Sequence, residues 1–425
     1  MKKLLVIVLV CISTVNIFAQ ATTNASLKKL INESFVYFSK VKEVENAEIA
    51  AKEKIRLTEL NKRPDINLNT SYNYMMPKIS FPINGNEIQF APINNIAGGV
   101  STNYTLLDFG KLRSVIEGEK IELEYAKHNT QFVKTELANQ VAMIYYSIVY
   151  FQKSFAIQDS IINYFKENIK IAENKFKNGD ALKIDVLNLQ ASKDQEENKR
   201  IDLQNLLEKQ ISLLIFTTGL NISSGNEFDF EMEEIPTSES FSIKNNPLFW
   251  LSQDKIDLTK KDLQRIKQNN NPLISLHANS GIKNGYVPEV NDLRFNYMGG
   301  VSLYLPLYGF GKIKQQIKVQ ETIIKQSELS KISLINNNKK DIEQVMIDIK
   351  YSKEKRKNIE SQIDAAKMAE EITSSRYKNG VATYLDINMA ATNIQKAYYA
   401  QLQNDYQLCV SKIALARLMG CIYWN

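Results

Sequence analysis

The sequence has few of the residues on which enzyme and metal sites depend. Its 425 residues include three cysteines and two histidines, and the histidines, His128 and His277, lie far apart. On one helix, Cys409 and Cys421 would lie ~18 Å apart, too far for a disulfide. We therefore expect no disulfide framework, no metal and no cofactor. No nucleophile–histidine–acid set or phosphate-binding loop indicates an enzyme.

A strong charge of one sign is also missing. The formal net charge is +6, and acidic and basic residues are interspersed along the chain. Nucleic acid is therefore not an expected partner.

Long apolar runs are missing after Gln20, where no stretch approaches the ~18 residues of a membrane-spanning helix. Before it, the basic start 1–3, the apolar run 4–12 and small Ala19 form the pattern of a secretory signal peptide over 1–19. The apolar run is too short for a membrane anchor. Since Gln20 rather than a cysteine follows the cleavage point, a lipid-anchored N-terminus is not expected either. The mature chain is predicted to be exported.

An internal repeat organises the chain, and such repeats indicate repeated structure. Matched residues are separated by a constant 201 positions, except near Pro64 and Pro272, which are 208 apart, so a loop in between changes length. We predict a first repeat over 20–219, a linking segment over 220–246 that wraps the outside, and a second repeat over 247–425. The matched pairs are Gly98-Gly99-Val100-Ser101 with Gly299-Gly300-Val301-Ser302, Phe109-Gly110-Lys111 with Phe310-Gly311-Lys312, Asn178-Gly179 with Asn379-Gly380, Asp185 with Asp386, and Gly219 with Gly420.

Each repeat contains two strands. Apolar and polar residues alternate over about 66–76 and 96–107, and again over about 273–282 and 293–305. A loop rich in proline, glycine and asparagine separates the first two. Each strand has the length of a tilted strand that crosses a bilayer, ~9–11 residues. A soluble sheet packed on helices fits the alternation as well.

Helical periodicity covers the rest. A helix is predicted over 26–62, ended by Pro64, a longer one over 111–178, and a return helix over 181–218. The long helix would measure ~100 Å and the other two ~55 Å each, so two short helices end to end match one long one. Its apolar residues form a heptad seam that is interrupted at Gln158. A coiled coil without a transport role would show the same seam.

Four strands that span a membrane cannot close a barrel, because the smallest spanning barrels have about eight strands and lipid does not tolerate an open sheet edge. Several copies must then share one barrel. Three copies supply twelve strands, enough for a hollow barrel.

The order of these elements and the motifs between them resemble the TolC-like outer membrane efflux proteins. The strand-to-helix motifs are Leu106-Leu107-Asp108-Phe109-Gly110-Lys111 and Leu305-Pro306-Leu307-Tyr308-Gly309-Phe310-Gly311-Lys312. The motifs that resemble the family's tip turns lie over 176–186 and 377–387. The resemblance implies a mainly α fold with a membrane β-barrel part, in which a trimeric twelve-stranded barrel stands on a long α-helical barrel.

The resemblance also implies a place and partners. The homotrimer would sit in outer-membrane lipid and extend into the periplasm. A periplasmic adaptor protein would connect it to an inner-membrane pump of the resistance-nodulation-division or ABC type. The chain would then be a passive duct, not an enzyme. Efflux of small toxic compounds or metal ions is the first hypothesis, type I protein secretion the second, and a structural coiled-coil envelope protein the third.

The candidate site lies at the tip turns. Gly179 and Gly380 permit tight reversals between helices, and Leu182 and Leu385 are candidates for adaptor contact. In a trimer Asp185 and Asp386 would each form a ring of three carboxylates, and such rings bind and select cations. A role in helix N-termini would explain both aspartates equally.

The family resemblance adds Tyr377 to this gate. The chain departs from the family pattern at Ala382, where a basic residue is expected, and at Met389, where an aspartate is expected. Arg376 or Lys378 are candidates to replace the missing basic group.

Overall fold

The computed structural model describes residues 26–83, 86–226, 228–230 and 245–424. The predicted signal peptide, 1–19, and most of the linking segment 220–246 lie outside these residues. The first half contains α1 (Leu27–Tyr37), α2 (Ser39–Leu60), β1 (Asp65–Tyr74), β2 (Ser80–Ile83), β3 (Asn86–Gln89), β4 (Asn94–Leu107), α3 (Lys111–Asn178) and α4 (Lys183–Thr218). The second half contains α5 (Pro247–Gln268), β5 (Leu273–Lys283), β6 (Arg294–Tyr304), α6 (Lys312–Lys378) and α7 (Tyr384–Met419).

Two elements differ from the sequence prediction. The single helix expected over 26–62 is divided into α1 and α2 at Phe38, whose backbone is extended (φ −69°, ψ 120°). The apolar period continues through this break because Phe38 packs edge-on against Phe216, with ring centroids 5.7 Å apart. The loop expected between the first two strands contains the hairpin β2–β3. The Asn84-Gly85 dipeptide between them is a typical hairpin signal.

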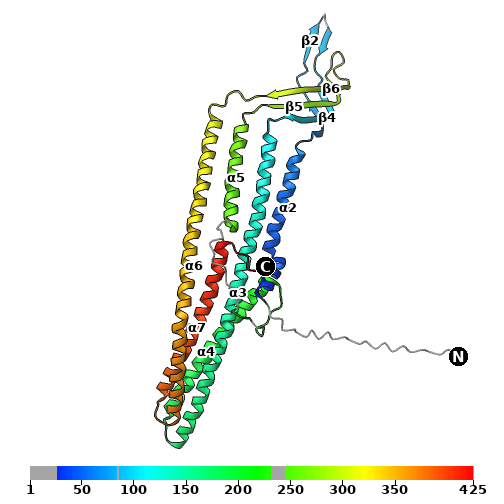
Figure 1. The fold of residues 1–425 in the computed structure, drawn as a ribbon. Coiled ribbons are helices and arrows are strands. Elements are labelled where there is room, and N and C mark those ends of the chain that lie inside the picture. The colour runs from blue at the N-terminus through cyan, green and yellow to red at the C-terminus, as the bar shows by residue number, and fades with distance from the viewer. Residues whose placement is uncertain (1–25, 84–85, 227, 231–244, 425) are drawn as a thin grey trace, which may run out of the picture.

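A four-stranded antiparallel sheet occupies one end of the molecule (Figure 1). Its order is β1-β4-β5-β6, so the central pair β4–β5 joins the two repeats and β1 and β6 are the free edges. Every residue of β1 is exposed. Gly281 in β5 faces β4 so closely that a Cβ there would overlap the carbonyl oxygen of Gly98.

The long helices α3 and α6 run from the sheet to the opposite end, whereas α2 and α5 lie in the half nearer the sheet and α4 and α7 in the half nearer the tip turns (Figure 1). The long helix α3 packs against α2 and α4, and the other long helix, α6, packs against α5 and α7. One long helix therefore lies beside two short ones in each repeat, as the predicted lengths required. The fold class predicted from the sequence is confirmed. Within the described part of the chain, no helix is both long enough and apolar enough to cross a membrane.

Two apolar clusters along α3 form most of the core. The upper core joins α1, α3, α4 and α7 and includes Leu30, Tyr146, Leu214 and Ile413. The lower core lies nearer the tips and joins α3, α4, α6 and α7, with Phe165, Leu189, Tyr377 and Ile387 among its residues. The residues of α3 between the two cores include Ser154 and Gln158, which are polar and fully buried.

Candidate functional site

The turns α3–α4 and α6–α7 lie together at the end of the molecule opposite the sheet (Figure 1). Gly179 and Gly380 have positive φ values, 84° and 78°, which favour glycine. In the first turn the Asp180 N–H donates to the Lys175 carbonyl oxygen at 2.8 Å, and in the second the Val381 N–H donates to that of Arg376 at 2.9 Å. Both long helices therefore end in the same left-handed glycine turn.

Asp185 and Asp386 lie in the first turns of α4 and α7, at matching positions. The Asp386 carboxylate accepts hydrogen bonds from the N–H and hydroxyl of Thr383, at 2.7 and 2.9 Å. The Asp185 carboxylate accepts one from the Leu182 N–H at 3.2 Å. Both aspartates therefore cap a helix, the alternative role that the sequence left open.

The charge of Asp386 is favoured by its surroundings. The backbone and side-chain hydrogen bonds from Thr383 lower the pKa of its carboxyl, and the positive charge of Arg376 lowers it further. The replacement of the missing basic residue at Ala382 by Arg376 stays a prediction. Ala382 itself packs against the lower core.

Tyr377 lies between the two turns and not at the surface. It is only 4% exposed, in the lower core. Lys175, at the end of α3, places its ammonium 4.6 Å from the centre of the Tyr377 ring and donates to its carbonyl oxygen. Burial raises the pKa of the Tyr377 hydroxyl, and the charge of Asp185 adds to the effect. Tyr377 therefore connects the tips of the two repeats.

Apolar side chains are exposed around both turns. Leu182 is 68% exposed and Leu385 57% exposed. Since exposed apolar patches mark binding surfaces, the tips have the character of a contact surface. The other large apolar side chains exposed here are Phe176, Ile184, Leu187, Val381 and Met389.

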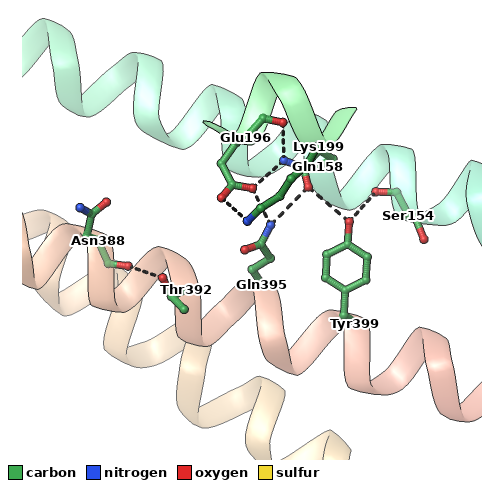
Figure 2. Close-up of polar contacts among 8 residues, drawn as sticks. All are labelled: Ser154, Gln158, Glu196, Lys199, Asn388, Thr392, Gln395 and Tyr399. Carbon is green, nitrogen blue, oxygen red and sulfur yellow. Dashed lines mark hydrogen bonds and ion pairs between the residues drawn. The ribbon is translucent and has the colours of Figure 1, made fainter. Parts of the chain in front are cut away.

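A buried polar cluster surrounds Gln158, and Figure 2 shows its side chains. Its only sign in the sequence was the interruption of the seam at Gln158. Gln158 of α3 donates to the Glu196 carboxylate of α4 at 2.7 Å, and Gln395 of α7 donates to the same oxygen at 2.8 Å. Lys199 donates to the other carboxylate oxygen at 2.7 Å. Tyr399 of α7 donates to the Gln158 side-chain oxygen at 3.3 Å. We call these five residues the Gln158 cluster.

Glu196 is only 8% exposed, yet its surroundings lower the pKa of its carboxyl. Burial raises the pKa of its carboxyl, but the hydrogen bonds from Lys199, Gln158 and Gln395 outweigh that effect, so the pKa lies below its ordinary value of 4.5. In the described part of the chain, no group of three or more His, Cys, Asp or Glu residues is arranged to hold a metal. Cys409 and Cys421 are buried free thiols.

Several solved structures with a similar fold are outer membrane channels. The chain is 16% identical to the CmeC outer membrane channel of Campylobacter jejuni, with a TM-score of 0.80 over 93% of this chain and 85% of that one. It is 16% identical to the outer-membrane channel OprN, with a TM-score of 0.81 over 95% and 92%. It is 18% identical to the outer membrane protein VceC of Vibrio cholerae, with a TM-score of 0.77 over 94% and 97%. Because these sequence identities are low, the structural similarity establishes a shared fold and nothing further.

The family follows from the sequence itself. No curated protein matches the chain. The family model described as outer membrane efflux protein matches residues 39–219 and 243–421, one segment in each repeat and most of the chain in total. Members of this family are channels rather than enzymes. The chain therefore belongs to the outer membrane efflux protein family.

Proposed function

We propose that the chain is the exit duct of a tripartite efflux pump in a Gram-negative type outer membrane. Three copies share one twelve-stranded barrel in the lipid, and their helices form a tube into the periplasm. The observation that carries the proposal is the division of the molecule into two ends: an open-edged sheet at one and the paired tip turns at the other. The sheet end suits the membrane, and the tip end suits partner proteins.

The sheet supports a shared barrel because its edges are unpaired within one chain. β1 and β6 present free backbone N–H and C=O groups, and a lipid environment requires these to be paired. Joining β6 of one copy to β1 of the next satisfies both edges, and three copies close the ring. The repeats 20–219 and 247–425, with the segment 220–246 between them, are the units of this arrangement.

At the tips we assign two roles. The exposed leucines Leu182 and Leu385 contact a periplasmic adaptor, which couples the duct to an inner-membrane pump of the resistance-nodulation-division or ABC type. Asp185 and Asp386, repeated by the trimer, form carboxylate rings at the entrance, and Tyr377 holds the tips of one copy together. The positive φ values of Gly179 and Gly380 allow the chain to reverse direction within a short turn at each tip.

A second candidate function is a duct for type I secretion of a polypeptide. The same barrel and tips serve both functions, since the pump rather than the duct selects the cargo. Small compounds are favoured here by the family match to efflux proteins.

The test is a deletion strain challenged with antibiotics, dyes, detergents and metal salts. Hypersensitivity to several of them that the intact gene reverses is the expected result. A channel of trimeric mass that conducts in planar bilayers should accompany it. Unchanged susceptibility together with loss of one secreted protein would favour the second candidate, and absence of conductance would refute both.

A further inference from the structure

The Gln158 cluster occupies a position that apolar residues fill in the second repeat. The repeat offset of 201 residues pairs Gln158 with Ile359 and Glu196 with Ala397. Ile359 and Ala397 belong to one small apolar cluster between α6 and α7. The fold therefore accepts an apolar pair at this level, and the polar pair in the first repeat is not required by the helix packing itself.

Unlike the apolar cluster of the second repeat, the Gln158 cluster connects the two repeats. Gln395 and Tyr399 belong to α7, in the second repeat, while Gln158, Glu196 and Lys199 belong to α3 and α4, in the first. Figure 2 shows Gln395 and Tyr399 extending from α7 toward the α3–α4 hairpin. Gln395 bonds both Glu196 and Gln158, at 2.8 and 3.2 Å. The hydrogen bonds thus cross from one repeat to the other.

The cluster also lies at a distinct position along the helix axes, between the upper and the lower core. On α3 the residues of the upper core end by Phe151, and those of the lower core begin at Ile161. Apolar contacts in the two cores tolerate small axial shifts, whereas a buried polar group accepts only the position in which its partners are satisfied. A single buried polar residue in an apolar helical seam fixes register in this way, at some cost in stability.

We propose that the Gln158 cluster locks the axial register of α7 against the α3–α4 hairpin. The lock keeps the two tip turns of each chain at one level and the lower core closed. If the chain is a duct, as proposed above, the lock also holds the entrance in one arrangement. The register claim itself rests on the contacts and not on the transport role.

The test removes the bonds from the α7 side with Gln395→Leu, which leaves the pair of Gln158 and Glu196 intact. Thr392→Val is the matched control, because Thr392 lies on the same helix and its hydroxyl bonds only the Asn388 carbonyl of that helix, at 2.8 Å. The reporter is Ala172→Cys, placed in the lower core where Ala172 is fully buried. Thiol labelling at position 172 is measured by mass spectrometry of its peptide, so the native cysteines stay in place.

We expect labelling at position 172 to become at least roughly fivefold faster in Gln395→Leu, because the loss of one such hydrogen bond changes a population about fivefold and this variant loses two. Labelling in Thr392→Val should match that of the parent. Equal rates in all three proteins would overturn the proposal. If Gln395→Leu does not assemble, Tyr399→Phe is the second variant, because it removes the contacts of the Tyr399 hydroxyl with the Gln158 side chain (3.3 Å) and the Ser154 carbonyl oxygen (3.5 Å), both on α3. It is expected to give a smaller increase, and no increase would overturn the lock. Planar-bilayer conductance of the parent separately tests the duct, so the two claims can fail independently.

Discussion

At the scale of single residues, Glu196 is unusual because three helices contribute to one buried carboxylate. Its partners Gln158, Lys199 and Gln395 come from α3, α4 and α7. A buried ionic group of this kind adds little net stability, but removing one partner leaves the others buried and unsatisfied. Single and double substitutions should therefore differ sharply.

We expect Glu196→Ala to lower the free energy of unfolding by ~1–3 kcal/mol, because the Gln158 and Gln395 amides lose the carboxylate to which both donate. The double variant Gln158→Ile with Glu196→Ala copies the second repeat and should cost less than the single one, in spite of the additional substitution. Denaturant unfolding of the purified protein measures both. Additive losses would show that the two side chains act independently.

The acid dependence of stability follows from the lowered pKa of Glu196. A carboxyl whose folded pKa is lowered contributes stability that is fully present above its ordinary pKa and is lost as the pH falls through the folded value. The parent should therefore lose thermal stability more steeply below pH 4.5 than Glu196→Gln does. Thermal melts over a descending pH series test this, and parallel curves would contradict the assignment.

At the scale of elements, the close approach of β4 and β5 joins the two repeats. A side chain at Gly281 would overlap the backbone of Gly98, whereas a Cβ at Gly98 itself, in β4, meets only the Thr70 methyl group, at 3.7 Å. Gly281→Ala should destabilise the sheet by at least ~1–3 kcal/mol, the usual cost of overpacking, and reduce trimer yield. Gly98→Ala is the control, because it lies in a central strand and meets no overlap, and it should assemble normally. Similar yields for both variants would show that the close approach at Gly281 does not hold the repeats together.

The tip turns make a second prediction at this scale. Gly380 has φ +78° and open space around it, so Gly380→Glu introduces local strain of ~1–2 kcal/mol and a charge on an apolar surface. We expect loss of adaptor binding with membrane insertion intact, measured by co-purification with a periplasmic adaptor protein. Lys325→Glu, on the exposed face of α6, is the control. Retained binding in Gly380→Glu would remove the tip from the adaptor contact.

Sequence periodicity predicted α3 and the four strands of the sheet closely because each follows one regular pattern between glycine or proline boundaries. It missed the break at Phe38, where the apolar pattern continues through a single extended residue. It located the tip residues but left the capping role of Asp185 and Asp386 as one of two alternatives. Sequence periodicity could not predict the partners of Gln158, because tertiary packing brings Glu196 and Gln395 to this side chain.

At the scale of the whole molecule, the proposed carboxylate rings depend on the symmetry of the trimer. In a trimer, Asp185 and Asp386 place six carboxylates near the entrance, so the combined variant Asp185→Asn with Asp386→Asn should reduce the cation preference of the isolated channel. The ratio of cation to anion permeability in planar bilayers measures this. Asp202→Asn, at an exposed position on α4, is the control, and an unchanged ratio in the double variant would exclude the carboxylate rings.

The long helices also differ as parts of a larger assembly. α3 has a buried residue in nearly every turn between Leu137 and Ala172, whereas α6 has few, among them Ile359, Ile363 and Tyr377. Large apolar side chains such as Leu329 and Ile332 remain exposed on α6. A single copy thus leaves one of its two long helices largely uncovered, as expected of a protomer that completes its core against its neighbours.

The two free edges of the sheet have a further consequence for how the protein is made. β1 and β6 are different strands, so copies joined edge to edge associate head to tail, and such a contact gives either a closed ring or an open-ended filament. Before closure, each chain carries the exposed edges that promote aggregation. The chain therefore needs either to meet two further copies rapidly or to be bound by a chaperone that covers both edges until the ring closes.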